Sequence, residues 1–189
     1  MAQLMVDYIT SLDGYGSAEG WPGLWGMGGP EYFAFLEEEG RQGHALLMGA
    51  TTHRLFARFA ESGEEATAEL AARRKYVFSH TLDAPLGLGD STLVRDDAVE
   101  FVRDLKRGDR PLRTLGSPSL VRSLLEAGLV DRYRVVVFPV VNGATGADRI
   151  YDGWPDVAFS DVTTRTFDGR LQLFEGTPTV LDGPPRADA

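Results

Sequence analysis

Short apolar segments alternate along the chain with stretches in which apolar residues recur at helical spacing. The apolar segments predict strands at Gln3–Ile9, His44–Met48, Lys75–Ser79, Ser91–Val94 and Arg132–Phe138. The last of these alternates at first and then becomes continuously β-branched. Such a pattern is typical of a strand that is covered on both faces of its sheet.

The stretches between these strands carry helix signals at both ends. Pro30 and Gly40 bound the first, and its acidic run Glu37–Glu39 is expected on a solvated face. Helices are predicted for Pro30–Glu39, from a cap at Thr51 or Thr52 through Phe59, within Glu61–Arg74, and for Ala98–Lys106 behind a cap at Asp97.

The C-terminal third reads differently, because strands there follow one another without helices. Antiparallel strands are predicted at Val157–Thr164, Leu171–Glu175 and Thr179–Leu181, with turns at Asp168–Gly169 and Gly176. The whole pattern predicts an α/β fold of three αβα layers, with a central mixed, mainly parallel sheet and antiparallel C-terminal strands. Residues 1–183 are expected to form one domain, and residues 184–189 a disordered tail.

One unit, from the short strand Leu112–Leu115 to Phe138, has a chemical implication. Gly116 permits a sharp turn, Ser117 can serve as N-cap, Pro118 suits the first helical position, and Gly128 can end the helix. The N–H groups of a first helical turn have no intrahelical partner, and the helix dipole adds positive potential there. Pyrophosphate is a common ligand of such a place, although the turn can also be only a well-capped helix start.

Composition narrows the function classes. The 189 residues include no cysteine, which excludes thiol catalysis and disulfides, and no histidine and carboxylate spacing suggests a metal site. The net charge of −9 disfavours nucleic acid and anionic membranes as partners. No apolar run reaches the ~20 residues of a membrane span, and the N-terminus lacks a signal sequence, so a cytoplasmic location is expected.

Five motifs together resemble the dihydrofolate-reductase-like superfamily, and in particular the reductase domain of riboflavin-biosynthesis deaminase/reductases. They are S-L-D-G from Ser11, M-G-x-x-T from Met48, K-Y-V-F-S-H-T-L from Lys75, G-x-P-x-L…L-L-x-A-G-L-V-D from Gly116, and F-P-V-V-x-G from Phe138. Their order and spacing match the family across nearly the whole chain.

The resemblance implies an NADPH site along the carboxyl ends of the strands, a small-molecule substrate and a homodimer. It implies cofactor contacts at Gly14, Gly49, Thr51, Thr52, Ser79, His80, Thr81, Leu115, Gly116, Ser117, Pro118, Ser119 and Leu120. It implies a catalytic role for Asp13, which could deliver a proton or bind an exocyclic amine; the alternative is a turn residue that bonds local backbone. Substrate contacts are expected at Asp13, Tyr15, Trp21 and Trp25.

The chain departs from the family pattern at four positions in or beside these contacts. Ser117 replaces a glycine, Ala50 and His80 replace arginines that favour a 2′-phosphate, and Leu115 replaces a glutamate that reads the pathway substrate. NADH is therefore possible beside NADPH, and a paralogue of 5-amino-6-(5-phosphoribosylamino)uracil reductase is expected.

The function predicted on this basis is an NAD(P)H-dependent reductase of a small pyrimidine- or pteridine-like heterocycle. The alternatives are a non-catalytic nucleotide-binding or sensor protein, and a structural dimer module with a filled cleft at Gly49 and Gly116. The aromatic loop Trp21–Gly29 either tucks under the domain, forms a lid over a flat ligand, or makes a dimer contact.

Overall fold

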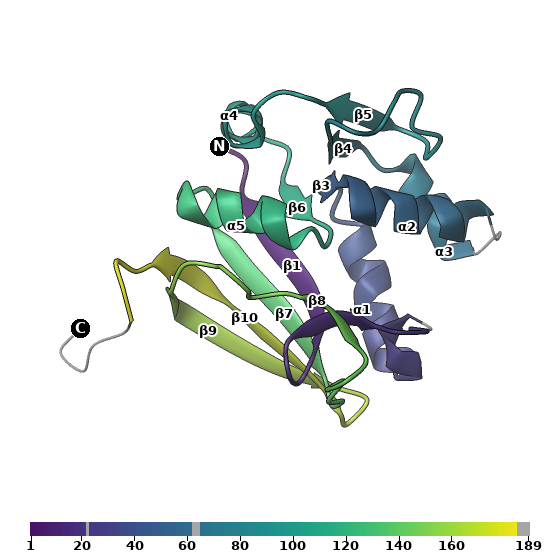
Figure 1. Ribbon diagram of the computed structural model, residues 1–189, viewed down its shortest axis with the longest axis vertical. Coiled ribbons are helices and arrows are strands. Elements are labelled where there is room, and N and C mark those ends of the chain that lie inside the picture. Colours follow the sequence, from purple (N-terminus) through teal and green to yellow (C-terminus); the bar gives the residue numbers. More distant parts are fainter. Residues whose placement is uncertain (22, 62–64, 185–189) are drawn as a thin grey trace.

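The computed structural model describes residues 1–21, 23–61 and 65–184. An eight-stranded sheet forms its centre, in the order β5-β4-β3-β6-β1-β7-β10-β9 (Figure 1). Neighbouring strands from β5 to β7 run parallel, whereas β10 runs antiparallel to β7 and β9. The predicted mixed, mainly parallel α/β fold is confirmed. The strands are β1 (Leu4–Ser11), β3 (Ala45–Gly49), β4 (Lys75–Phe78), β5 (Ser91–Val94), β6 (Leu112–Thr114), β7 (Arg132–Phe138), β9 (Val157–Phe167) and β10 (Leu171–Val180).

Helices cover both faces of this sheet. α4 (Ala98–Leu105) and α5 (Pro118–Glu126) pack on one face. α1 (Pro30–Gly40) and α3 (Glu65–Ala72) pack on the other, and α2 (Ala50–Glu61) precedes α3 in the same crossover from β3 to β4. A short 3₁₀ helix, η1 (Leu24–Gly26), lies before α1.

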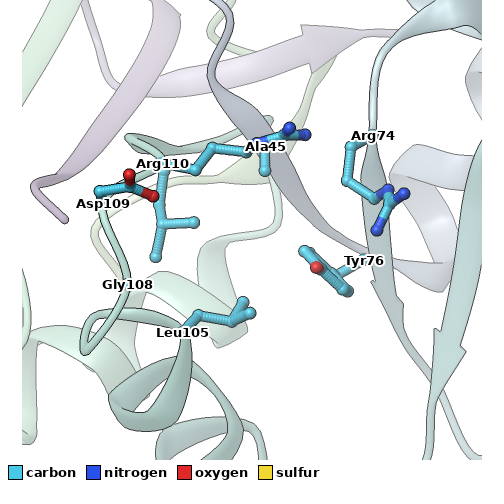
Figure 2. A pocket seen from close by; sticks show the side chains of 8 residues that line it. Ala45, Arg74, Tyr76, Leu105, Gly108, Asp109 and Arg110 are labelled. Carbon is cyan, nitrogen blue, oxygen red and sulfur yellow. The ribbon is translucent and has the colours of Figure 1, made fainter.

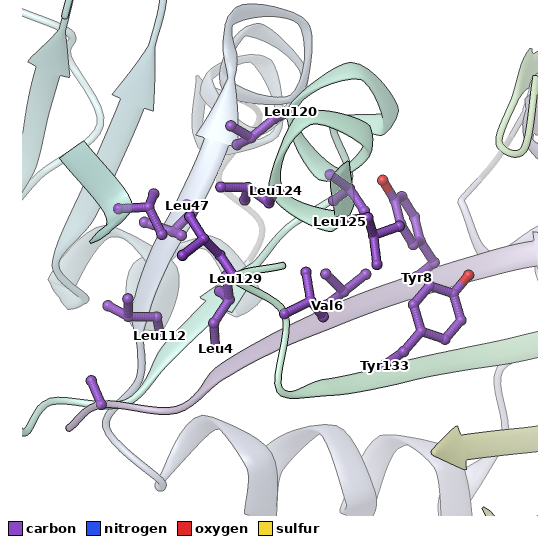
Figure 3. Packing of buried hydrophobic residues seen from close by; sticks show 14 of the residues in the cluster. Leu4, Val6, Tyr8, Leu47, Leu112, Leu120, Leu124, Leu125, Leu129 and Tyr133 are labelled. Atoms are coloured by element: carbon purple, nitrogen blue, oxygen red, sulfur yellow. The ribbon is translucent and has the colours of Figure 1, made fainter. Parts of the chain in front are cut away.

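Strict alternation in β1 decides which side chains meet which helices. Leu4, Val6 and Tyr8 are at least 96% buried and lie beneath α5 beside Tyr133 of β7 (Figure 3). Asp7, between Val6 and Tyr8, points to the face that α1 covers, because successive side chains of a strand alternate. The central strand β7 has the predicted bounds and is mostly buried.

The far end of α5 confirms the predicted glycine stop. Gly128 has φ 64°, its N–H donates to the Leu125 carbonyl, and the Leu129 N–H donates to the Leu124 carbonyl. This pair of bonds is a Schellman motif, which satisfies carbonyls that the helix itself leaves unpaired.

Two local expectations are wrong, and one pair of strands was not predicted. Gly176 is no turn: it lies within β10 at a register shift between Glu175 and Thr177, so a β-bulge keeps one long strand where two were predicted. Neither Thr51 nor Thr52 is an N-cap, since α2 begins at Ala50. The ladder between β2 (Tyr15–Ala18) and β8 (Gly146–Arg149) was not predicted, because the polar, glycine-rich sequence of both segments carries no strand pattern.

The acidic run of α1 is also not wholly solvated. Glu39 is 6% exposed, and its carboxylate accepts from Arg134 at 2.6 Å. Arg134 also contacts Asp7 at 3.1 Å, and Arg113 pairs with Asp7. Burial alone would raise the pKa of Asp7, but the charges of Arg113 and Arg134 lower it below its usual value.

The tail predicted for residues 184–189 lies, from residue 185 onward, outside the described residues.

Candidate functional site

Two strand-to-helix junctions lie side by side at the carboxyl edge of the sheet. β3 and β6 are parallel neighbours, with Leu47 opposite Thr114, so Gly49 and Gly116 leave the sheet close together. The crossover after β3 packs on one face of the sheet through Leu70 of α3, whereas α5 packs on the other face. Such a topological switch point leaves a crevice outside the strand ends, which is where open α/β sheets bind ligands.

Ser117 bridges these two junctions. Its Oγ accepts from the Gly49 N–H at 2.7 Å and lies 3.1 Å from Thr52 Oγ1. A Cβ atom placed on Gly116 would lie 2.9 Å from Thr52 Oγ1, so the glycine is needed for this close approach. The predicted cofactor residues Gly49, Thr52, Gly116 and Ser117 are thus brought together.

The opening of α5 differs from the predicted cap in one respect. Ser117 stands at the N-cap position, but its side chain makes no capping bond, because the hydroxyl is turned to Gly49 and Thr52. Pro118 has no N–H, and the first-turn N–H groups of Ser119 and Leu120 do not donate to the Ser117 side chain. An anion outside this turn would meet the positive end of the α5 dipole.

Backbone strain accompanies this arrangement. Gly116 and Ser117 both have positive φ, at 58° and 67°. A left-handed conformation costs a residue with a Cβ roughly 1–2 kcal/mol, which glycine avoids. A serine in place of a second glycine at position 117 therefore destabilises this backbone conformation, and the hydrogen bonds of its hydroxyl offset that cost.

The loop after β4 forms the neighbouring part of the rim. The Ser79 hydroxyl accepts from the N–H groups of Thr81 at 3.0 Å and Leu82 at 3.1 Å, which folds the loop back on itself. His80 and Thr81 are exposed. Thr81 Oγ1 accepts from Arg54 of α2 at 3.2 Å, a contact that the sequence motifs did not indicate.

Asp13 lies in the turn after β1 and is held by three donors. Its carboxylate accepts from Ser11 Oγ at 2.6 Å, from the Asn142 N–H at 3.1 Å and from the Gly143 N–H at 2.9 Å. The Ser11 hydroxyl and the Gly143 amide lower the pKa of Asp13 from 3.8 to about 2. Asp13 is therefore ionised at neutral pH, which favours an acceptor role over proton delivery.

Trp25 is tied to the same turn. Its Nε1 donates to Asn142 Oδ1 at 2.9 Å, and its ring lies 5.2 Å from Phe138 and 5.4 Å from Trp21. Leu24, Trp25 and Met27 accordingly pack on the apolar cluster under α1, so this part of the loop tucks against the sheet end. Asn142, which joins Asp13 to Trp25, was missed as a site residue; it occupies the variable place of the motif after Phe138.

Three further residues predicted for the site, Tyr15, Leu115 and Gly14, make their contacts with other parts of the chain. The Tyr15 ring packs on Gly146 and under the Arg149 guanidinium, 5.1 Å away. Leu115 packs beside Leu46 and Met48, and the Gly14 carbonyl accepts from the Ile150 N–H.

Two measurable cavities lie elsewhere. One of about 210 Å³ sits at the opposite, amino edge of the sheet, between Arg74, Tyr76, Leu105 and Arg110 (Figure 2). Another of about 360 Å³ is lined by aromatic residues of β7, β9, β10 and the segment before β9. Within the described ranges, we find neither a carboxylate and histidine cluster fit for a metal ion nor a helix capable of crossing a membrane.

Comparison with known proteins identifies the family behind this geometry. The family model described as RibD C-terminal domain matches residues 2–173. The chain belongs to this family. A curated relative of this RibD C-terminal domain protein, YyaP of Bacillus subtilis strain 168, is 25% identical over 174 residues and is itself uncharacterised; the match covers 87% of this chain and 89% of YyaP.

Solved structures share its fold. A putative riboflavin biosynthesis protein from Shewanella sp. PV-4 superposes with a TM-score of 0.69 at 21% identity, covering 95% of this chain and 99% of that one. The riboflavin biosynthesis reductase Rib7 of Saccharomyces cerevisiae gives 0.61 at 12% identity, covering 94% and 90%. The predicted resemblance to reductase domains of riboflavin biosynthesis is confirmed at the level of family and fold.

Proposed function

We propose that this protein is a reductase that transfers a hydride from NADPH to a small, flat heterocycle of pyrimidine- or pteridine-like shape, with NADH as a possible donor. The observation that carries the proposal is the pair of helix openings at Gly49 and Gly116, set side by side at the switch point of the sheet. In a protein with a net charge of −9, backbone amides supply positive potential that the surface as a whole lacks.

The residues at the rim would have different roles in binding the cofactor and the substrate. Ser119 and Leu120, in the first turn of α5, would hold the cofactor pyrophosphate, and the loop of residues 79–81 would contact its adenosine end. The bound cofactor would supply the hydride. Asp13, whose carboxylate is oriented by Ser11, Asn142 and Gly143, would accept a hydrogen bond from an amine of the substrate. Trp25, packed on Phe138, would help exclude water.

The substrate would differ from that of the pathway enzyme. Leu115 stands where the resemblance places a substrate-reading glutamate, and its side chain packs on apolar neighbours. A site that lacks a carboxylate at this place presents apolar surface, so we propose a paralogue whose substrate carries no polar group there.

A second candidate is a nucleotide-binding protein without catalysis, and Ser117 favours it. The Ser117 hydroxyl already occupies the Gly49 amide, so a phosphate must either displace it or bind outside it. Titration with NADPH and NADH, followed by tryptophan fluorescence, tests binding. NADPH oxidation with a panel of oxidised heterocycles then separates the two: turnover supports the reductase, and binding without turnover across the panel supports the second candidate.

We also propose that the protein forms a homodimer through the face of β9 and β10 that α5 leaves uncovered. Phe159 and Phe174 lie on this face and line the larger cavity. Light scattering on the protein as it elutes from a size-exclusion column should give twice the chain mass of 20.6 kDa. A single chain mass across the micromolar range would contradict this.

A further inference from the structure

The smaller cavity, between Arg74, Tyr76, Leu105 and Arg110, has no part in the proposed reductase function. It has a volume of about 210 Å³ and lies at the amino edge of the sheet, where the parallel neighbours β4, β3 and β6 begin. The end of α4 and the loop of residues 106–111, which joins α4 to β6, line it from the other side. Five separate parts of the chain therefore meet around one space (Figure 2).

The side of the cavity that the sheet provides is apolar. Ala45 and Leu112, the first residues of β3 and β6, are 1% and 2% exposed and belong to the core cluster beneath α4 and α5. Leu105 and the Tyr76 ring pack against that cluster, and the ring lies 5.4 Å from Phe101 of α4. An apolar cavity of ~150 Å³ holds benzene, so this larger cavity has room for an aromatic ring with a small polar group.

The side that the loop provides carries two opposite charges without partners. Asp109 and Arg110 both line the cavity, and neither side chain makes a hydrogen bond or ion pair with any residue that the structure describes. Figure 2 shows them on one side of the space and Arg74 on the other. Arg74 is already paired, because its Nε donates to Asp90 at 2.8 Å. The unpaired charges of the cavity are therefore one carboxylate and one guanidinium.

These charges define the class of ligand that fits. An exposed loop charge needs no partner in water, but here both charges lie beside an apolar recess of the size of a small molecule. A ligand with a single charge would be attracted by one of the two side chains and repelled by the other. A zwitterion with an apolar substituent satisfies both side chains and also covers the apolar surface.

We propose that this cavity binds a free α-amino acid with an apolar side chain. Arg110 binds its carboxylate through the two parallel N–H donors of the guanidinium, and Asp109 accepts from its ammonium group. The apolar side chain of the ligand lies against Tyr76, Leu105 and Leu112. The site is at the edge of the sheet opposite Gly49 and Gly116, so it does not depend on the proposed reductase function.

Titration of the whole protein with L-phenylalanine, 3-phenylpropionate and phenethylamine, followed by backbone amide NMR, tests the proposal. The second ligand lacks the ammonium group, and the third lacks the carboxylate. L-phenylalanine should shift the amides of Gly108 and Leu112 saturably, because both residues line the cavity. Each of the other two should bind at least about 10-fold more weakly, as expected for one lost charge-assisted hydrogen bond.

Two variants assign the two charges of the ligand. Asp109→Asn should weaken L-phenylalanine about 10-fold without weakening 3-phenylpropionate, and Arg110→Gln should weaken L-phenylalanine as much without weakening phenethylamine. Arg107→Gln is the matched control, since Arg107 is exposed in the same loop, pairs with Asp104 and does not line the cavity. It should leave the affinity for L-phenylalanine unchanged.

Four results would overturn the proposal. The first is no saturable shift with L-phenylalanine at millimolar concentration. The second is binding of 3-phenylpropionate or phenethylamine as tight as that of L-phenylalanine, because a single charge would then suffice. The third is equal weakening by Arg107→Gln, which would show only a general effect of charge. The fourth is a set of shifts confined to the carboxyl edge around Gly49 and Gly116, which would place the ligand at the candidate site instead.

Discussion

At the scale of single residues, Ser117 governs the candidate site. Its hydroxyl joins the two helix openings, and its φ of 67° places a side chain in a backbone conformation that favours glycine. The motif predicted a residue at the N-cap. It could not predict the hydroxyl's direction, because that depends on Gly49, 68 residues earlier in the chain.

Replacing Ser117 by glycine should tighten NADPH binding about fivefold, because the Gly49 amide is released and one such hydrogen bond contributes about 1 kcal/mol. Stability should change little, since lost hydroxyl contacts and relieved strain oppose each other. Calorimetry measures the affinity. Ser117→Ala keeps the strain and removes the hydroxyl, so it should show the same gain in affinity with lower stability. Weaker binding in both variants would mean that the hydroxyl itself contacts the cofactor.

Asp13 gives a prediction in pH. Its pKa is about 2 in the folded protein against an ordinary 3.8, so its ionised form stabilises the fold above pH 4, and this contribution is lost as pH falls toward 2. Urea unfolding of wild-type protein and Asp13→Asn should show a stability difference that shrinks over this interval. A difference that is constant from pH 6 to pH 2 would refute the hydrogen-bonded turn.

At the scale of elements, α1 is docked by charge as well as by apolar contacts. Tyr32 and the rings around it fill the apolar part of the interface, whereas Glu39 meets Arg134 and Arg113 below. Buried ion pairs add little net stability when complete, but removal of one partner leaves an unpaired buried charge.

Glu39→Gln should therefore lower the free energy of unfolding by about 3 kcal/mol. Glu38→Gln, at the exposed neighbouring position, should stay within roughly 0.5 kcal/mol of wild type. Denaturant unfolding compares the two. Equal stability of both variants would show that the ion cluster does not hold α1.

Elements were predictable where one local signal sufficed. The bounds of β5 and β7 and the glycine stop of α5 follow from apolar runs and from Gly128. Features that depend on distant partners were not predictable. Glu39 of α1 is buried because Arg113 of β6 and Arg134 of β7 pair with it. The strand β2 forms because β8, more than 120 residues later, lies beside it.

At the scale of the molecule, the order of strands in the sheet brings the two helix openings of the candidate site together. β6 enters between β3 and β1, so the helices after β3 and β6 diverge and their openings remain adjacent. The sequence predicted each opening singly, and the family resemblance placed both at one cofactor. Their adjacency is a property of topology, which no local pattern encodes.

We propose that the opening of α5 at Gly116 binds the pyrophosphate of a nicotinamide dinucleotide. Calorimetric titration of NADPH into wild-type protein, Gly116→Ala and Gly128→Ala tests it most directly. Both glycines have φ near 60°, so the two substitutions impose similar backbone strain at opposite ends of α5, but only residue 116 lies at the rim. We predict saturable binding that weakens at least about 10-fold in Gly116→Ala and is unchanged in Gly128→Ala. Equal affinity in the two variants, or no binding of NADPH and NADH at millimolar concentration by the wild-type protein, would contradict it.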